Sequence, residues 1–116
     1  MFALGDLIEE MRTHKQVITL FALIGYHPDD KRCRVLNVTG LMCAYGDIED
    51  MRMTIYGKLV RLCREHGIYV KIICGSSVKS KIKRLWPSTN VVVHSHMPGV
   101  NEHDVMLHWS CTIPPF

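Results

Sequence analysis

The sequence predicts a single α/β domain over residues 1–116, in which helices pack in three layers against a mixed sheet. Ile68–Cys74 and Asn90–His96 are short, apolar and β-branched, with a helical segment between them. Such runs are typical of parallel strands buried on both faces and joined by a crossover helix. Hydrophobic residues make up 47% of the chain and charged residues 22%, which fits one globular domain with its own core.

The N-terminal part predicts a helix followed by an antiparallel hairpin. Leu4–Arg12 places apolar residues on one helical face and acidic residues on the other. Gln16–Tyr26 and Arg32–Val38 are rich in β-formers, and the residues between them, His27–Lys31, are typical of a turn. Thr39-Gly40 is expected to bend or bulge the second strand before it continues toward Tyr45.

The strongest helix signal follows this hairpin. Asp47 is a good N-cap residue, and Asp50 can complete a capping-box-like start. Arg64 and His66 stand in the last turn, where cations complement the helix dipole, and Gly67 is the expected C-cap. Apolar side chains recur at helical spacing between these ends, at Ile48, Met51, Ile55, Leu59 and Leu62.

A second helix is expected at Val78–Trp86. Gly75 ends the preceding strand, and Ser76 or Ser77 is expected to cap this helix with its hydroxyl. The stripe predicted to face the sheet consists of Val78, Ile82 and Leu85. Farther on, Asn101–Trp109 fits a capped helix, although a strand fits nearly as well, and the tail from Thr112 is extended.

The turn after Cys74 is a candidate anion site. Gly75, Ser76 and Ser77 leave a strand and open a helix, where free N–H groups and the helix dipole attract phosphate, with Lys79 close by. An ordinary capped turn explains the same residues, and neither known glycine-rich phosphate fingerprint is present. The segment also resembles, faintly, loops in which a strand-end cysteine above a helix attacks phosphate, although it lacks their arginine.

The carboxyl ends of three predicted strands carry polar residues that a ligand could use. If the strands are parallel, Asp47, the Gly75–Ser77 turn and His94-Ser95-His96 share one edge of the sheet. His94 and His96 are expected on the same strand face, where they could act as acid or base or hold a divalent metal. Asp104 and His108 would add ligands if that segment were helical, while chance scatter of seven histidines is the plain alternative.

A modest basic patch suggests a second class of function. The net charge is +3, and the excess comes mainly from the helix after Ser77. A non-enzymatic nucleic-acid-binding module would use Lys71, Lys79, Lys81, Lys83 and Arg84. Few aromatic residues stand beside these cations, which disfavours sequence-tolerant single-strand binding.

The cysteine pattern and the hydropathy of the chain indicate the cellular compartment that we expect for this protein. The five cysteines form no CxxC pair and lie mostly inside predicted elements, as expected for reduced thiols in a cytoplasmic protein. No apolar run reaches the length of a membrane span, and the first residues do not fit a secretory signal.

The leading expectation is therefore a small cytoplasmic protein that binds a phosphorylated small molecule, a nucleotide or a short oligonucleotide, while the sequence leaves open whether it also hydrolyses this ligand. The alternatives are the nucleic-acid module and a homo-oligomeric assembly protein. An oligomer would form through the apolar strand Val17–Gly25 or through the Pro-Pro-Phe tail.

Overall fold

The chain folds around a five-stranded mixed sheet, with two helices among the residues that the structure describes. The computed structural model describes residues 17–43, 48–98 and 105–116. The strands, in chain order, are β1 (Val17–His27), β2 (Asp30–Cys43), β3 (Tyr69–Cys74), β4 (Asn90–Pro98) and β5 (Val105–Ile113). The helices are α2 (Ile48–Glu65) and α3 (Ser76–Leu85).

The sheet combines a hairpin with a parallel portion, which confirms the predicted fold class. Its strand order is β1-β2-β3-β5-β4. β1 and β2 pair antiparallel, β2 and β3 parallel, and β5 runs antiparallel to both β3 and β4. Because β2, β3 and β4 consequently point the same way, their carboxyl ends lie at one edge, as the sequence-based site required.

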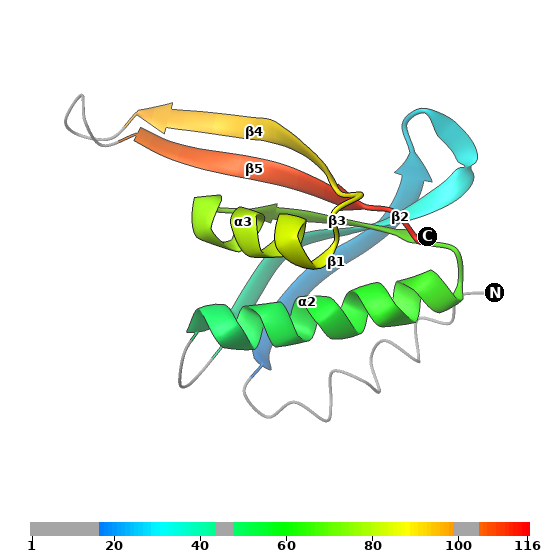
Figure 1. The fold of residues 1–116 in the computed structure, drawn as a ribbon, viewed down its shortest axis with the longest axis horizontal. Helices are drawn as coiled ribbons and strands as arrows, with labels where there is room; N and C mark the ends of the chain where they lie inside the picture. The colour runs from blue at the N-terminus through cyan, green and yellow to red at the C-terminus, as the bar shows by residue number, and fades with distance from the viewer. Residues whose placement is uncertain (1–16, 44–47, 99–104) are drawn as a thin grey trace.

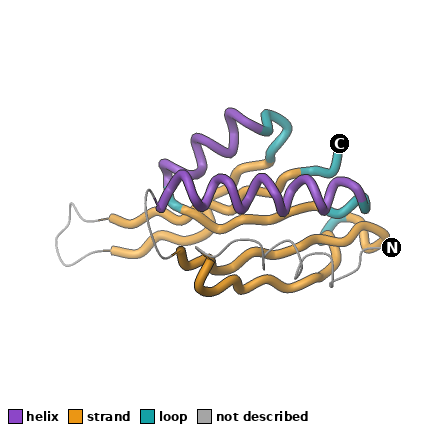
Figure 2. The backbone as a smooth tube through the Cα atoms, turned by 90° about the horizontal axis from the view of Figure 1, so that it is seen from below, coloured by secondary structure: helices purple, strands orange, loops and turns teal. Residues whose placement is uncertain are grey.

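Both described helices cover the same face of the sheet (Figures 1 and 2), so the described residues form two layers and not the predicted three, and among them β3 is covered on one face only. The crossovers from β2 to β3 and from β3 to β4 advance in the same direction, and right-handed connections then place their helices on one side. An ion pair between Lys81 of α3 and Glu49 of α2, 3.2 Å long, joins them. The helix predicted at Leu4–Arg12 lies outside the described residues.

The core fills the space between this face and the helices. Alternate residues of β3 are buried, and Ile55 and Leu59 of α2 are wholly inaccessible to solvent. α2 ends at the predicted C-cap, where Gly67 has φ +68°, a left-handed conformation that glycine adopts without steric cost. Cys63 closes the last turn through its carbonyl, which accepts the N–H groups of His66 and Ile68.

The predicted bulge in the hairpin is confirmed. Phe21 pairs with Gly40 and Ala22 with Val38, so Thr39 is the extra residue. A side chain at Gly40 would meet the Phe21 ring at 3.1 Å, so glycine leaves room for that ring beside the bulge. The bulge lies just beyond the segment of β2 that pairs with β3, and a bulge of this kind bends its strand.

Two details of the α3 prediction are wrong. The N-cap is Gly75, without a side-chain cap bond, and both serines lie inside the helix. Leu85, expected in the core, is 59% exposed. The apolar stripe advances by four residues at each step, from Val78 to Ile82 to Trp86, which packs against the core in its place.

The helix favoured for Asn101–Trp109 is also wrong for residues 105–109, which belong to β5. β5 lies between β3 and β4 and pairs with both. Hydrogen bonds along both edges stabilise a central strand more than local helix propensity can oppose. The strand interpretation, which the sequence supported almost equally, is the one that holds.

Candidate anion-binding site at the carboxyl edge of the sheet

The sheet opens at the carboxyl end of β3. The ladder between β2 and β3 runs from the Val35–Tyr69 pair to Val38–Ile72, and both described strands continue beyond it without pairing to each other. On the other side, Cys74 pairs with Trp109, and β4 and β5 extend farther (Figure 1). α3 therefore begins at an edge where one flank is unpaired and the other is a projecting hairpin.

The first turn of α3 leaves three backbone donors without an acceptor in the helix. The amide of Lys79 makes the first helical bond, to the carbonyl of Gly75 at 3.0 Å, so the N–H groups of the three preceding residues have no acceptor within the helix. Gly75, Ser76 and Ser77 are exposed, and the first turn contains no acidic residue. A Cβ at Gly75 would meet no atom within 4 Å, so the space beside the turn is open.

A tryptophan that sequence reasoning did not assign to the site orders this turn. The indole Nε1–H of Trp109 donates to Ser76 Oγ at 3.2 Å, and Lys79 Nζ lies 4.2 Å from the centre of the same ring. Because the Ser76 hydroxyl accepts from the indole, its own proton is left to donate. The interaction with the π face holds the ammonium of Lys79 one turn from Ser76. One sequence signal could have pointed to it: if residues 109–111 form a strand, Trp109 and Cys111 project to the same face, which is the face that the helices cover.

Cys74 does not have the role of the phosphate-attacking cysteine in the loops that this segment faintly resembles. Its side chain points into the core beneath α3 and is 8% exposed. Its Sγ lies 3.8 Å from Cys111 Sγ, and the hydrogen bond with Cys111, followed by burial, raises the pKa of Cys74 well above its usual range. A buried, protonated thiol is a poor nucleophile, so Cys74 is a core residue.

The register of β4 departs from the plain alternation on which the pairing of His94 and His96 was predicted. β4 has a register shift between Val93 and Ser95, with the exposed His94 as the extra residue, so simple alternation no longer places His94 and His96 on one face. The side chain of His96 lies outside the described residues, as do Asp47 and Asp104. His108 is in a strand, which removes the helical spacing proposed for metal binding. Among the described residues, no three potential ligands gather around a common point.

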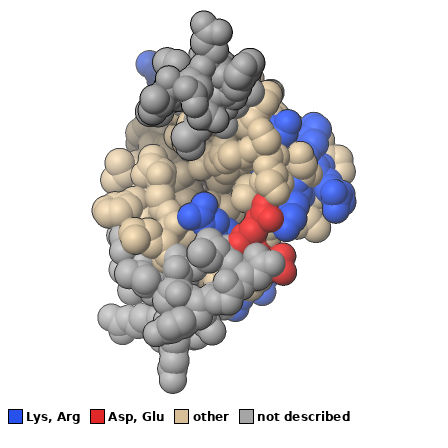
Figure 3. Space-filling model, turned by 90° about the vertical axis from the view of Figure 1, so that its left-hand side faces the viewer, with Lys and Arg blue, Asp and Glu red and all other residues tan. Residues whose placement is uncertain are grey.

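The basic residues of α3 are partly neutralised or held by protein groups. Lys81 pairs with Glu49 at 3.2 Å and Asp50 at 3.6 Å, and the hydrogen bond with Glu49 is the main cause of its raised pKa. In the view onto this edge, lysine and arginine atoms adjoin acidic ones (Figure 3). Lys83 Nζ donates to the carbonyls of Pro87 and Thr89 at 2.8 and 2.9 Å.

Lys71 lies away from this helix. It pairs with Asn37 across β2 and β3, on the sheet face opposite α3, while Arg84 is exposed near the end of α3. The five cations proposed for nucleic acid therefore do not all lie on one side of the sheet, and Lys79, Lys81 and Lys83 each contact protein groups.

The cysteine expectation holds for the four cysteines described: Cys33, Cys63, Cys74 and Cys111 are free thiols. No helix in the described part of the chain combines the length and apolarity needed to cross a membrane.

Comparison with known proteins yields little. No protein-family model matches the chain, and no curated protein matches it. Among solved structures, one chain from the crystal structure of the NatC complex bound to Gag peptide and CoA has 11% identical residues and a TM-score of 0.42. The match covers 82% of this chain and 58% of that chain. A similarity at this level carries no argument about function.

Proposed function

We propose that this domain binds a phosphorylated small molecule, such as a nucleotide, at the carboxyl edge of the sheet. The phosphate would sit on the N–H groups of the first turn of α3, beside Ser76 and Lys79. The observation that carries the proposal is the arrangement of this turn. It is exposed, free of carboxylates and open beside Gly75, and Trp109 positions both a hydroxyl and an ammonium next to it.

Physical reasoning supports an anion here over a neutral ligand. The helix dipole, the unpaired N–H groups and the Lys79 ammonium all favour negative charge at the same place. Charge-assisted hydrogen bonds are roughly twice as strong as neutral ones, so a phosphate gains more from this turn than a carbonyl or hydroxyl would. Hydrolysis by His94 and His96 stays a sequence-based prediction, since no described contact links either imidazole to this turn.

The proposal is tested by titration calorimetry with ADP, and with adenosine as the ligand that lacks phosphate. We expect ADP to bind and adenosine to bind at least about tenfold more weakly. Ser76→Asp should abolish ADP binding without unfolding the protein, because a carboxylate repels phosphate yet stabilises a helix N-terminus by about 0.3–1 kcal/mol. Thr54→Asp, which adds the same charge at an exposed position of α2, is the control and should bind ADP normally.

Equal affinities for ADP and adenosine would contradict the proposal. So would a Ser76→Asp protein that retains the wild-type affinity for ADP. Binding that falls steeply with salt and extends to phosphate-rich polymers would favour the nucleic-acid alternative.

A second candidate, assembly through β1, has an observation of its own. Phe21 and Leu23 are 60% and 72% exposed, on the face of β1 opposite the one that packs against the core. β1 is also the edge of the sheet, and nothing pairs with its outer side among the described residues. An exposed, apolar edge strand favours pairing with a second copy of the chain. The test is the mass of the protein in dilute solution.

A further inference from the structure

A row of polar side chains crosses the sheet on the face that the described helices leave open. Asn37 pairs with Lys71, Lys71 with Thr112, and Thr112 with Asn90. Residues paired directly across strands project to the same face. Because the neighbouring Ile72 and Cys111 point into the helix-covered core, the row projects to the opposite side.

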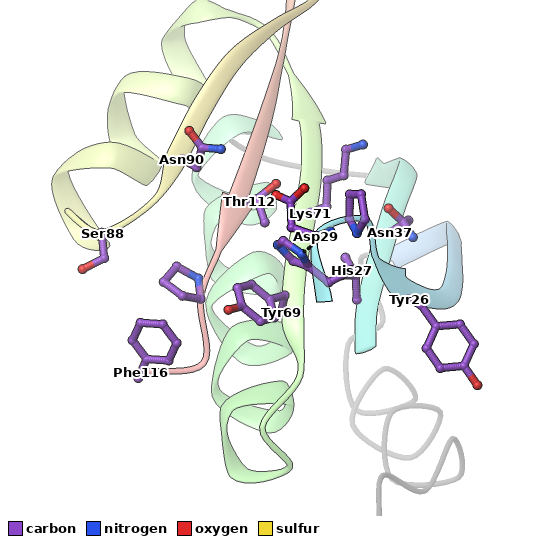
Figure 4. Close-up of a pocket in the computed structure, with 13 residues that line it drawn as sticks. Tyr26, His27, Asp29, Asn37, Tyr69, Lys71, Ser88, Asn90, Thr112 and Phe116 are labelled. Atoms are coloured by element: carbon purple, nitrogen blue, oxygen red, sulfur yellow. Dashed lines mark hydrogen bonds between the residues drawn. The ribbon is translucent and has the colours of Figure 1, made fainter. Parts of the chain in front are cut away.

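The row forms part of a cavity of about 420 Å³. Aromatic side chains line it at the amino end of β3 (Figure 4). The rings of His27 and Tyr69 lie 4.7 Å apart between centroids, and Phe116 meets Tyr69 edge-on at 6.3 Å. The turn that carries His27 is held by a 3.1 Å bond from the Asp29 amide to His27 Nδ1, while Tyr26 points away from the group (Figure 4).

The polar side chains of this row lack protein partners. Within residues 17–43, 48–98 and 105–116, no hydrogen bond or ion pair engages the side chains of Asn37, Lys71, Asn90 or Thr112, although all but Asn90 are half-buried. Half-buried polar groups are normally satisfied by protein, water or ligand. Three such groups and the exposed Asn90 line one cavity, to which Lys71 brings an ammonium and the exposed Asp29 a carboxylate, so the donors for an anion lie on the sheet around Lys71.

We infer that this cavity is a second ligand site, which takes a small aromatic molecule bearing one carboxylate. The carboxylate lies against Lys71, between the amide of Asn37 and the hydroxyl of Thr112, and the ring lies against Tyr69 and His27. Pockets of this size commonly bind small ligands through an apolar wall and a few convergent polar groups. The inference does not depend on the proposed function, because Ser76 and α3 lie on the other face of the sheet.

The test uses ¹⁵N-labelled full-length protein titrated with 2-naphthoate, and with 2-naphthamide as its uncharged counterpart. We expect saturable shifts of the amide signals of Tyr69, Lys71 and Thr112 with naphthoate, and affinity for naphthamide that is about tenfold lower. Lys71→Met should weaken naphthoate by a similar factor and leave naphthamide unchanged, because it removes the charge and keeps the stem. Arg84→Met removes one charge from α3 and should bind both probes as the wild type does.

Three outcomes would overturn the inference. Equal affinity for the two probes would show that the carboxylate does not contribute to binding. Equal losses for Lys71→Met and Arg84→Met would indicate an effect of overall charge. Shifts centred on Ser76, Ser77 and Lys79 would place naphthoate at the carboxyl edge and leave the open-face cavity without a ligand.

Discussion

At the scale of single residues, burial decides what the thiols can do. Cys63 lies on the core face of α2 with no exposed surface, and this burial raises its pKa to about 12. Thiolate is the reactive form, so Cys63 is chemically inert in the folded protein at ordinary pH. Cys33, in contrast, is half-exposed on the hairpin and is the thiol that a reagent would reach first among those described.

The raised pKa of Cys63 predicts a pH-dependent loss of stability. The thiol ionises in the unfolded chain near its ordinary pKa of about 9 but stays protonated when folded up to about pH 12. Its contribution is therefore complete below about pH 9, and above that the unfolding free energy falls by at most about 1.4 kcal/mol per pH unit. Urea unfolding of wild type and Cys63→Ala between pH 8 and pH 10.5, roughly the window implied by linkage, measures it.

The comparison isolates one group among several that titrate in alkali. The Cys63→Ala curve should start lower, because of the lost packing, and decline less steeply than wild type. Parallel curves for the two proteins would show that Cys63 ionises equally in both states, against the prediction.

At the scale of elements, the glycine inside α2 and the glycine at its C-cap have opposite effects on stability. Gly67 has a left-handed φ of +68°, whereas Gly57 lies inside the helix. A Cβ at either position would meet no atom within 4 Å, so conformation alone distinguishes them.

Substitution of each glycine by alanine should therefore change stability in opposite directions. Gly67→Ala is expected to lower the free energy of unfolding by about 1–2 kcal/mol, because alanine resists the left-handed region. Gly57→Ala is expected to raise it by about 0.5–1 kcal/mol through better helix propensity. Urea unfolding at neutral pH measures both, and a shift of both variants in the same direction would contradict the argument.

At the scale of the whole molecule, the edge strand β1 is where a second copy of the chain could add. The exposed apolar side chains of Phe21 and Leu23 cost stability or solubility in an isolated domain unless something covers them. Pairing along β1 would extend the sheet and remove its open edge.

Light scattering after size exclusion tests this idea with two lysine substitutions. If β1 forms the interface, the wild type should have a mass that is a multiple of 13.3 kDa. Leu23→Lys should then reduce the mass to that of a monomer. Leu85→Lys is the matched control, since Leu85 is 59% exposed on α3, and should leave the mass unchanged. A wild-type monomer at every concentration would end the proposal, and dissociation by Leu85→Lys would locate the interface elsewhere.

An element could be predicted from the sequence when the residues that specify it lie close together in the chain. The hairpin, its bulge at Thr39, the C-cap of α2 and the strand before Gly75 were all predictable, because turn chemistry, glycine conformation and hydrophobic period act over a few residues. β5 was predicted less well, because its local helix signal competed with pairing partners distant in the chain.

The sites divide in the same way. The exposed turn Gly75–Ser77 and the nearby Lys79 were identified from order along the chain, since a strand followed by a helix start is a local pattern. Trp109 could not be placed there, because its contact with Ser76 spans 33 residues and depends on the register of β3 with β5. The row of polar side chains on the open face of the sheet could not be predicted either, because it contains one residue from each of four strands.

By itself the sequence determined which segments become strands and helices at most positions, which face of α2 is apolar, and where glycine must end a helix. Only the tertiary structure decided the strand order and the bulge at His94, which shifts the register between His94 and His96. It also decided that Lys81 and Lys83 contact protein groups. The physical reason is the distance along the chain over which each interaction acts. Propensity and capping are energies of neighbouring residues, whereas register and side-chain pairing are fixed by contacts that exist only after the chain has packed.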